Sequence, residues 1–264
     1  MRTHRTLPVS TLCALLLASS AWAQIEINHA KAIAGGVTPG DTPGYPVTLS
    51  LAGSYKLTGI LSVPNANTDA IVITADYITL DLNGFLIHGT TVCTGKPHVT
   101  SCSPTGSGVG IRALGHKGMV VTNGQIFGMG SVGIFGGSNG RIEHIVAQSN
   151  GFPGMSVDHS NLVINNQALN NGGSGISVGH NNTVLNNTVS GNGSSGIDTL
   201  SNNTVLNNTV SDSGGVGLSL DTGVGYAHNV LNNNNSAAIP PIQVIGGVEM
   251  PPGSNVCNGD TTCP

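Results

Sequence analysis

The feature that most constrains the fold is an exact internal repeat. The ten residues NNTVLNNTVS occupy 181–190 and recur without a change at 202–211, so the two copies define a 21-residue period. Glycines follow the same period, at Gly133, Gly154, Gly175, Gly196 and Gly217. A fixed period of about twenty residues is typical of a solenoid, in which each repeat packs only on its neighbours.

Within each repeat, apolar residues recur at fixed distances from the glycine. With the glycine as position zero, they fall at positions one, three, nine and fourteen. Neighbouring residues on a strand point to opposite sides, so positions one and three face a core and position two faces outward. No stretch has helical apolar spacing, and Asn and Gly clusters between the apolar positions favour turns. The repeat therefore predicts short strands, stacked in parallel from coil to coil.

Position twelve adds a second signal. It holds Ile145 in one repeat and asparagine in the next four, namely Asn166, Asn187, Asn208 and Asn229. Stacked amides can hydrogen-bond to the coils above and below, which satisfies polar groups that are costly to bury alone. We therefore predict an all-β, right-handed parallel β-helix with coils of about 21 residues and an asparagine ladder.

With these glycine and asparagine motifs the chain resembles the exported right-handed parallel β-helix proteins of the pectin-lyase-like superfamily, over residues 46–248. The resemblance implies a polysaccharide as partner or substrate. It also implies that calcium is a candidate cofactor, because lyases of this superfamily hold calcium with acidic residues and remove a proton with Arg or Lys. The residues themselves predict no cofactor, since the acidic ones are scattered along the coils and form no cluster in the sequence.

The chain divides into four predicted segments. Residues 1–23 have a basic start, an apolar stretch and the small-x-small site Ala21-Trp22-Ala23, which predicts a cleaved signal peptide and export to the periplasm or the medium. Residues 24–45 are expected to cap the first coil. The β-helix spans 46–248 with an inserted loop at 89–107, and 249–264 form a C-terminal tail.

Four cysteines remain after the signal segment: Cys93, Cys102, Cys257 and Cys263. In an exported chain an even number suggests disulfides, and the short separations favour pairing Cys93 with Cys102 and Cys257 with Cys263. Four cysteines allow three connectivities, and zinc is the alternative, although no C-x-x-C spacing occurs. The pairing is thus a hypothesis.

Charge and hydropathy exclude some classes of function. Beyond residue 23 the chain has six Lys or Arg against twelve Asp or Glu, and no basic cluster, which argues against a nucleic-acid partner. No stretch beyond the signal segment is long and apolar enough to predict a membrane span. The oligomeric state does not follow from the sequence.

Two outward patches carry residues suited to chemistry. The repeat register places His159 beside His180 on adjacent coils, with Asp158 next to the first and Asp198 one coil beyond the second. These residue types suit proton transfer or metal binding. The alternative is that they are ordinary outward polar residues, which any soluble solenoid has.

The second candidate patch contains four residues, Arg112, Arg141, Glu143 and His144, with Lys117 nearby. Two arginines could pair the carboxylate of a uronate sugar. Arg141 and Glu143 could equally form a solvated ion pair of little consequence.

Two classes of function remain open on the sequence alone. The first is an exported protein that acts on or binds a polysaccharide, as a lyase, epimerase, hydrolase or binding protein. The second is a structural or surface-associated solenoid that makes protein contacts. Whether the chain is an enzyme stays open, because fold analogy does not establish a catalytic site. Few aromatic residues lie within the coils, which weakens the case for a deep sugar-binding cleft.

Overall fold

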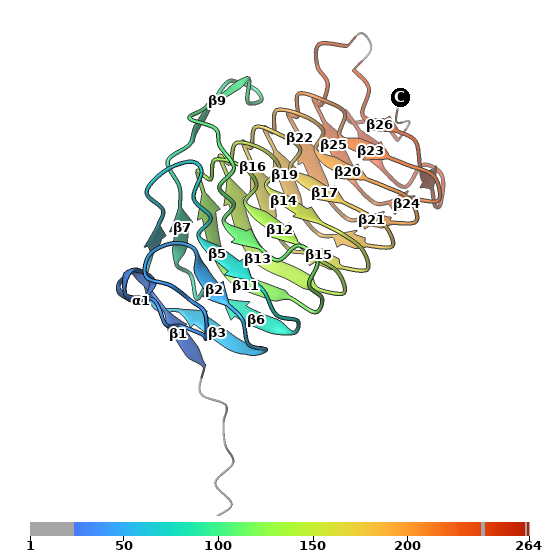
Figure 1. Cartoon of the computed structure of the whole chain (residues 1–264). Coiled ribbons are helices and arrows are strands. Elements are labelled where there is room, and N and C mark those ends of the chain that lie inside the picture. The colour runs from blue at the N-terminus through green and yellow to red at the C-terminus, as the bar shows by residue number, and fades with distance from the viewer. Residues whose placement is uncertain (1–23, 239–240, 262, 264) are drawn as a thin grey trace, which may run out of the picture.

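The computed structural model describes residues 24–238, 241–261 and 263. The predicted signal peptide, residues 1–23, lies outside the described residues. The chain winds into a solenoid of parallel strands, which runs from the N-terminal helix at one end to the C-terminal coils at the other (Figure 1). No helix of the described part is long and apolar enough to cross a membrane.

One wall of the solenoid is a nine-stranded parallel sheet. It receives one short strand from each coil. In spatial order these strands are β2 (Val47–Leu49), β5 (Ile71–Ile73), β10 (Ile111–Arg112), β12 (Ile134–Gly136), β14 (Met155–Val157), β17 (Ile176–Val178), β20 (Ile197–Thr199), β23 (Leu218–Leu220) and β26 (Val244–Ile245).

The other two walls belong to one seventeen-stranded sheet, because β11 and β13 run through both of them. Most coils contribute two strands to it. The strands are β1 (Ile25–Ile27), β3 (Gly53–Leu57), β4 (Leu61–Ser62), β6 (Ile78–Asp81), β7 (Leu86–His88), β11 (Val120–Phe127), β13 (Arg141–Gln148), β15 (Leu162–Ile164), β16 (Gln167–Leu169), β18 (Thr183–Leu185), β19 (Thr188–Ser190), β21 (Thr204–Leu206), β22 (Thr209–Ser211), β24 (Gly225–Ala227), β25 (Val230–Asn232), β27 (Val248–Glu249) and β28 (Val256–Cys257).

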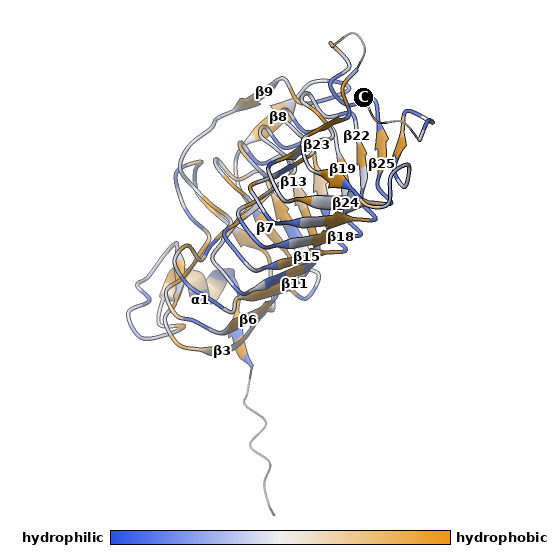
Figure 2. Cartoon of the chain, turned by 90° about the vertical axis from the view of Figure 1, so that its right-hand side faces the viewer, coloured by the Kyte–Doolittle hydropathy of each residue, from blue (hydrophilic) through white to orange (hydrophobic). Residues whose placement is uncertain are grey.

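The register of the strands confirms the predicted period. Ile176 pairs with Ile197, Val184 with Val205 and Val189 with Val210, so each residue lies beside its equivalent in the next coil. All of these side chains are fully buried in one continuous core. Figure 2 shows the apolar strands repeating along the solenoid with hydrophilic turns between them. The predicted all-β parallel solenoid is therefore confirmed.

The regular coils turn three corners, and a buried amide ladder runs along each of these corners from Asn150, Asn161 and Asn166 onward. The predicted ladder at position twelve is present: Nδ2 of Asn187 donates to Oδ1 of Asn208 at 3.0 Å, and Oδ1 of Asn187 accepts the backbone N–H of Asn166 at 2.9 Å. Two ladders that the sequence analysis missed occupy the other corners. They are formed by Asn161, Asn182 and Asn203 at position seven, and by Asn150, Asn171, Asn192 and Asn234 at position seventeen.

The periodic glycines lie where neighbouring coils approach most closely. A Cβ on Gly175 would lie 2.8 Å from Nδ2 of Asn192 and 2.9 Å from the carbonyl oxygen of Gly196. Such distances are shorter than real Cβ contacts, so only glycine fits beside the amide ladder. The repeated glycine is thus a packing requirement of this corner.

The two ends of the core are closed differently. At the N-terminal end, the short helix α1 (His29–Ala34) buries Ala32 against the first coils. At the C-terminal end, Cys257 extends the ladder of Leu231 and is joined to Cys263, which packs on the end of the core. A two-stranded antiparallel hairpin, β8 (Val92–Thr94) and β9 (Ser101–Ser103), stands apart from both large sheets.

Candidate functional site

A groove of about 300 Å³ crosses the outer face of the nine-stranded sheet. It lies over β12, β14, β17 and β20, and Leu114 from the coil of β10 extends it, so five consecutive coils contribute to it. Its lining residues are Leu114, Phe135, Ser156, Val157, Asp158, Ser177, Val178, Gly179, Asp198 and Leu200.

The floor of the groove is the outward row at position two. The register places Phe135 beside Ser156, Ser156 beside Ser177, and Ser177 beside Asp198. All four side chains are partly exposed, while the residues on either side of them in each strand are buried. The alternation of the strand therefore presents one ring, two hydroxyls and one carboxylate, one per coil, to the solvent.

The rim of the groove is formed at the ends of the strands. Leu114 and Leu200 are both about half exposed, at 53% and 50%. Asp158 is exposed on the same rim, and its Oδ2 lies 3.2 Å from Nδ1 of His159. The groove thus combines an apolar rim with two carboxylates, those of Asp158 and Asp198.

The predicted histidine patch is only partly joined to this groove. His159 and His180 occupy equivalent positions on adjacent coils, since the N–H of Ser160 donates to the carbonyl of His180 at 3.0 Å. Nδ1 of His180 lies 3.1 Å from Oγ of Ser201, on the following coil. Neither imidazole lines the groove, whereas both carboxylates of that patch do.

Arg112 lies in the same outward row as Phe135, one coil earlier. Its guanidinium holds the carboxylate of Asp69 through two contacts, Nε to Oδ2 at 2.6 Å and Nη2 to Oδ1 at 3.0 Å. The hydrogen bond to Asp69 raises the pKa of Arg112 above its ordinary value, although partial burial opposes the shift. Nη2 also donates to the carbonyl of Ser107, so this arginine ties the preceding loops to the sheet.

The second predicted patch is divided between two sheets. Arg141 and Glu143 lie on β13 of the seventeen-stranded sheet, and Nη2 of Arg141 contacts Oε2 of Glu143 at 2.6 Å. Arg112 belongs to the nine-stranded sheet, so the expectation that it joins Arg141 in one patch is wrong. His144 is an exposed corner residue with a positive φ of 54°, immediately before Ile145 of the position-twelve corner. Its left-handed backbone conformation allows the chain to turn at this corner.

Nothing in the described residues resembles a metal centre. No three His, Cys, Asp or Glu side chains among them gather closely enough to hold an ion. Calcium sites need several oxygen ligands around one point. The residues of the groove therefore do not fit the calcium site that the resemblance implies.

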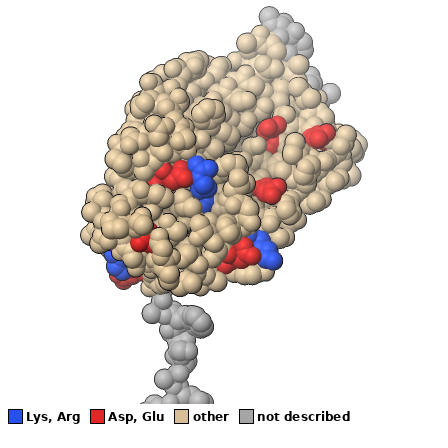
Figure 3. All heavy atoms as spheres, viewed as in Figure 1, with Lys and Arg blue, Asp and Glu red and all other residues tan. Residues whose placement is uncertain are grey.

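Charge is distributed unevenly along the solenoid. On the face drawn in Figure 3, basic and acidic groups lie side by side over the N-terminal coils, whereas the acidic groups over the C-terminal coils have no basic group beside them. The sequence accounts for this, because Arg141 is its last Lys or Arg. No Lys or Arg side chain of the described residues lines the groove, whereas Lys96 lies beside Asn170 and Asp212 at a different corner.

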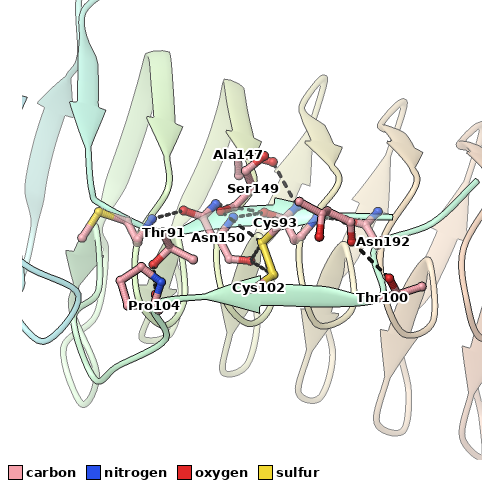
Figure 4. The surroundings of a disulfide bond; sticks show 12 residues. Thr91, Cys93, Thr100, Cys102, Pro104, Ala147, Ser149, Asn150 and Asn192 are labelled. Atoms are coloured by element: carbon pink, nitrogen blue, oxygen red, sulfur yellow. Dashed lines mark hydrogen bonds between the residues drawn. A yellow bond between two sulfur atoms is a disulfide. The ribbon is translucent and has the colours of Figure 1, made fainter. Parts of the chain in front are cut away.

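The inserted loop forms a strap along a corner of the solenoid. We use "strap" for the hairpin at 92–103, which the disulfide between Cys93 and Cys102 closes. Figure 4 shows its two strands running across successive coils, with the disulfide beside Ser149 and Asn150. The N–H of Val99 donates to the carbonyl of Gly191 at 2.9 Å, which fixes the strap two coils further along.

A second glycine column makes room for the strap. It occupies position eighteen, at Gly151, Gly172, Gly193 and Gly214. A Cβ on Gly172 would collide with the carbonyl of Gly151 and would lie 2.8 Å from Sγ of Cys102. These glycines and the strap line a hollow of about 420 Å³. The glycine column is visible in the sequence. That it makes room for the strap is not, because the strap lies far away from these glycines along the chain.

Sequence reasoning named only Asp158 and Asp198 among the groove residues, and it missed the other eight, which are Leu114, Phe135, Ser156, Val157, Ser177, Val178, Gly179 and Leu200. Phe135, Ser156 and Ser177 belong to the outward column at position two, and their signal was a row of exposed side chains without obvious chemistry. Leu114 and Leu200 gave no signal, because exposed leucines are common on protein surfaces.

Comparisons with known proteins agree on the fold. The family model described as "Right handed beta helix region" matches residues 66–236. The A-module of the mannuronan C-5 epimerase AlgE4 from Azotobacter vinelandii superposes with a TM-score of 0.50 and 16% sequence identity, over 81% of this chain and 68% of that one. The Dettilon tailspike protein gp208 gives a TM-score of 0.47 and 18% identity, over 80% of this chain and 50% of that one.

A comparison with curated proteins finds no match. At these identities the similarity to solved structures concerns the fold alone. The family match covers more than half of the chain and coincides with the coils that carry the ladders and the groove. The chain therefore belongs to the right-handed beta helix family.

Proposed function

We propose that this is an exported protein that binds a polysaccharide along the groove of the nine-stranded sheet. The observation that carries the proposal is the row formed by Phe135, Ser156, Ser177 and Asp198 on successive coils. Parallel coils repeat at about 4.8 Å, so the row offers polar groups at regular intervals. A linear glycan also presents its hydroxyl groups at regular intervals, so it can contact several coils at once.

The apolar parts of the groove suit a sugar ring as well. The face of Phe135 can stack on the C–H side of a sugar, while the half-exposed Leu114 and Leu200 supply apolar contact at the rim. Hydroxyls and carboxylates beside them can bind sugar hydroxyls. This combination of apolar contact and a few polar groups is typical of ligand sites.

Two further observations support export and a glycan partner. Disulfides persist in oxidising compartments, and the structure holds two, Cys93–Cys102 and Cys257–Cys263. They accompany the signal peptide expected at residues 1–23. The epimerase module that shares the fold is named for mannuronan, a polysaccharide.

Affinity electrophoresis through gels that contain single polysaccharides would test the proposal. We expect at least one polysaccharide to retard the protein, and Phe135→Ala to weaken its affinity about five- to tenfold through lost stacking. Phe152→Ala is the matched control, because Phe152 is 50% exposed but does not line the groove. Equal losses for the two variants would contradict the site.

Hydrolysis is a second candidate, because the groove contains two carboxylates. Glycoside hydrolysis commonly uses a pair of carboxylates, one as the acid and one as the base or nucleophile. Release of reducing ends that disappears in both Asp158→Asn and Asp198→Asn would support it. Proton abstraction by arginine is less well supported, since Arg112 and Arg141 are each held in an ion pair.

The structural alternative makes a different prediction. A solenoid that serves only protein contacts would bind none of the polysaccharides and would release no product. That result would favour the structural function over the glycan-binding one, provided that circular dichroism shows the protein to be folded.

A further inference from the structure

We infer that the groove selects glycans without acidic groups, and that amino groups on the sugar raise the affinity. The inference rests on the proposed function and names the substrate class for that same groove. It follows from the charges around the groove and not from the row of Phe135, Ser156, Ser177 and Asp198 alone.

Cations are distributed unevenly along the chain. All six Lys and Arg residues beyond residue 23 lie at or before Arg141. Seven acidic residues follow it, namely Glu143, Asp158, Asp198, Asp212, Asp221, Glu249 and Asp260. The strands β14, β17 and β20 of the groove floor therefore belong to coils that have no Lys or Arg of their own, and the coils of β14 and β20 supply the carboxylates of Asp158 and Asp198.

The cations nearest to the groove along the chain are Arg112, Lys117 and Arg141. The guanidinium of Arg112 is held by both oxygens of Asp69 and by the carbonyl of Ser107. Arg141 is paired with Glu143 on the other sheet. Lys117 lies with Nζ 5.8 Å from the ring of Tyr77. None of these three cations lines the groove.

A polyuronate would meet an unfavourable field in such a groove. Each uronate sugar carries a negative charge, and a bound carboxylate needs a cation or several N–H donors to replace its water. The groove instead presents the carboxylates of Asp158 and Asp198. Like charges in this arrangement repel, whereas a protonated amine on the sugar would be attracted.

Calorimetric titration with three hexasaccharides of equal length tests the inference. The probes are a hexamer of N-acetylglucosamine, the same hexamer without acetyl groups, and a hexamer of galacturonic acid, each in low-salt buffer at pH 6.5. We expect the deacetylated hexamer to bind at least about fivefold more tightly than the acetylated one, as one extra charge pair near the surface would give. The galacturonate hexamer should bind most weakly.

Variants assign the preference to the groove. Asp198→Asn should reduce the preference for the deacetylated hexamer about fivefold, and Asp198→Lys should raise the affinity for galacturonate. Asp212→Asn is the control, since Asp212 lies outside the groove, bonded to Asn233 at another corner. An equal effect of Asp212→Asn would show that overall charge, and not the groove, sets the preference, and would overturn the inference.

The failure of the inference differs from the failure of the proposed function. If the galacturonate hexamer binds most tightly and loses affinity in Phe135→Ala, the groove binds glycans but the inferred selectivity is wrong. If no hexamer binds, the inferred preference for neutral and amino-bearing glycans is wrong, whereas the proposed function is still decided by the wider set of polysaccharides. If Phe135→Ala changes none of the affinities, the proposed site itself is wrong and the inference falls with it.

Discussion

Single residues at the corners decide whether a coil can stack on the next one. Each regular corner pairs a residue of positive φ with an inward amide, as in Asn186 (φ 57°) followed by the buried Asn187. Asparagine suits the first position because it tolerates the left-handed region, and the second because its amide both donates and accepts. The dipeptide Asn-Asn in the repeat therefore carries two separate functions.

Ser213 interrupts the ladder at position seventeen, where neighbouring coils have Asn192 and Asn234. Its hydroxyl is buried and has no hydrogen-bond partner among the described residues. We predict that Ser213→Asn stabilises the protein by about 1–2 kcal/mol, because the new amide would complete the hydrogen bonds of the ladder. Gly196 provides the space beside it, as Gly175 does for Asn192. Urea denaturation would measure the change.

The converse substitution is the control. Asn187→Ser would introduce the same gap into an intact ladder, and we expect a loss of about 2 kcal/mol. Asn186→Gly, at the exposed neighbour with positive φ, should change the free energy of unfolding little. If Ser213→Asn destabilises the protein, the missing amide at this corner does not reduce its stability, and the prediction is wrong.

At the scale of elements, the amide ladder at position twelve ends in the C-terminal strands, where its last asparagine bonds to a carboxylate. Oε1 of Glu249, in β27, accepts hydrogen bonds from Nδ2 of Asn255 at 2.7 Å and from its backbone N–H at 2.9 Å. Asn255 in turn accepts from Asn229, the preceding amide of the ladder at position twelve. Although burial acts to raise the pKa of Glu249, hydrogen bonds from Asn255, Gly253 and Ser254 together lower it below its ordinary 4.5.

This lowered pKa predicts a pH-dependent stability. The ionised carboxylate stabilises the folded state fully above about pH 4.5, and the contribution is lost as the pH falls through the lower pKa of the folded state. We expect Glu249→Gln to lower the thermal midpoint by about 1–3 °C at pH 7, because a partly exposed carboxylate contributes modestly. The difference should be smaller at pH 3 than at pH 7.

Differential scanning calorimetry at the two pH values would check this. Glu26→Gln, at an exposed glutamate of β1, serves as the control for removing a carboxylate elsewhere. A difference between the parent and Glu249→Gln that stays the same at pH 3 would contradict the assigned role.

At the scale of the whole molecule, stability depends on whole coils in register. Apart from the strap, which reaches Gly191, each coil contacts only its neighbours, so a solenoid can lose one coil and keep its other interfaces. We predict that deletion of residues 182–202, which removes one whole period and joins Asn181 to Asn203, leaves a protein that folds and unfolds cooperatively. Its thermal midpoint should be lower than that of the parent.

Deletion of residues 182–201 is the matched test of register. Removing one residue fewer than a whole period shifts the following strands by one position, which turns core side chains outward and polar ones inward. This variant should be at least about 3 kcal/mol less stable than the whole-period deletion, because it buries polar groups without partners. Equal stability of the two, measured by urea denaturation, would show that the period does not govern stacking.

Much of the fold could be predicted because local pattern and global packing coincide in a solenoid. Equivalent residues of neighbouring coils have the same surroundings: Val184 pairs with Val205, and Asn187 bonds to Asn208. The period of the sequence is therefore the period of the structure. The candidate site could be predicted less well. Asp158 and Asp198 were named and lie in one groove, but Phe135 and Leu200 became site residues only through the stacking of four coils.

The amino-acid sequence by itself determined the solenoid, its period and its core, because equivalent residues meet their own repeats at a constant separation along the chain. The tertiary structure alone decided what the irregular residues do. It paired Arg112 with the distant Asp69, laid the strap over the glycines of later coils, and separated Arg112 from Arg141. These contacts depend on the path of the inserted segments and on the sheet that each strand joins. The repeat period of the sequence specifies neither of these.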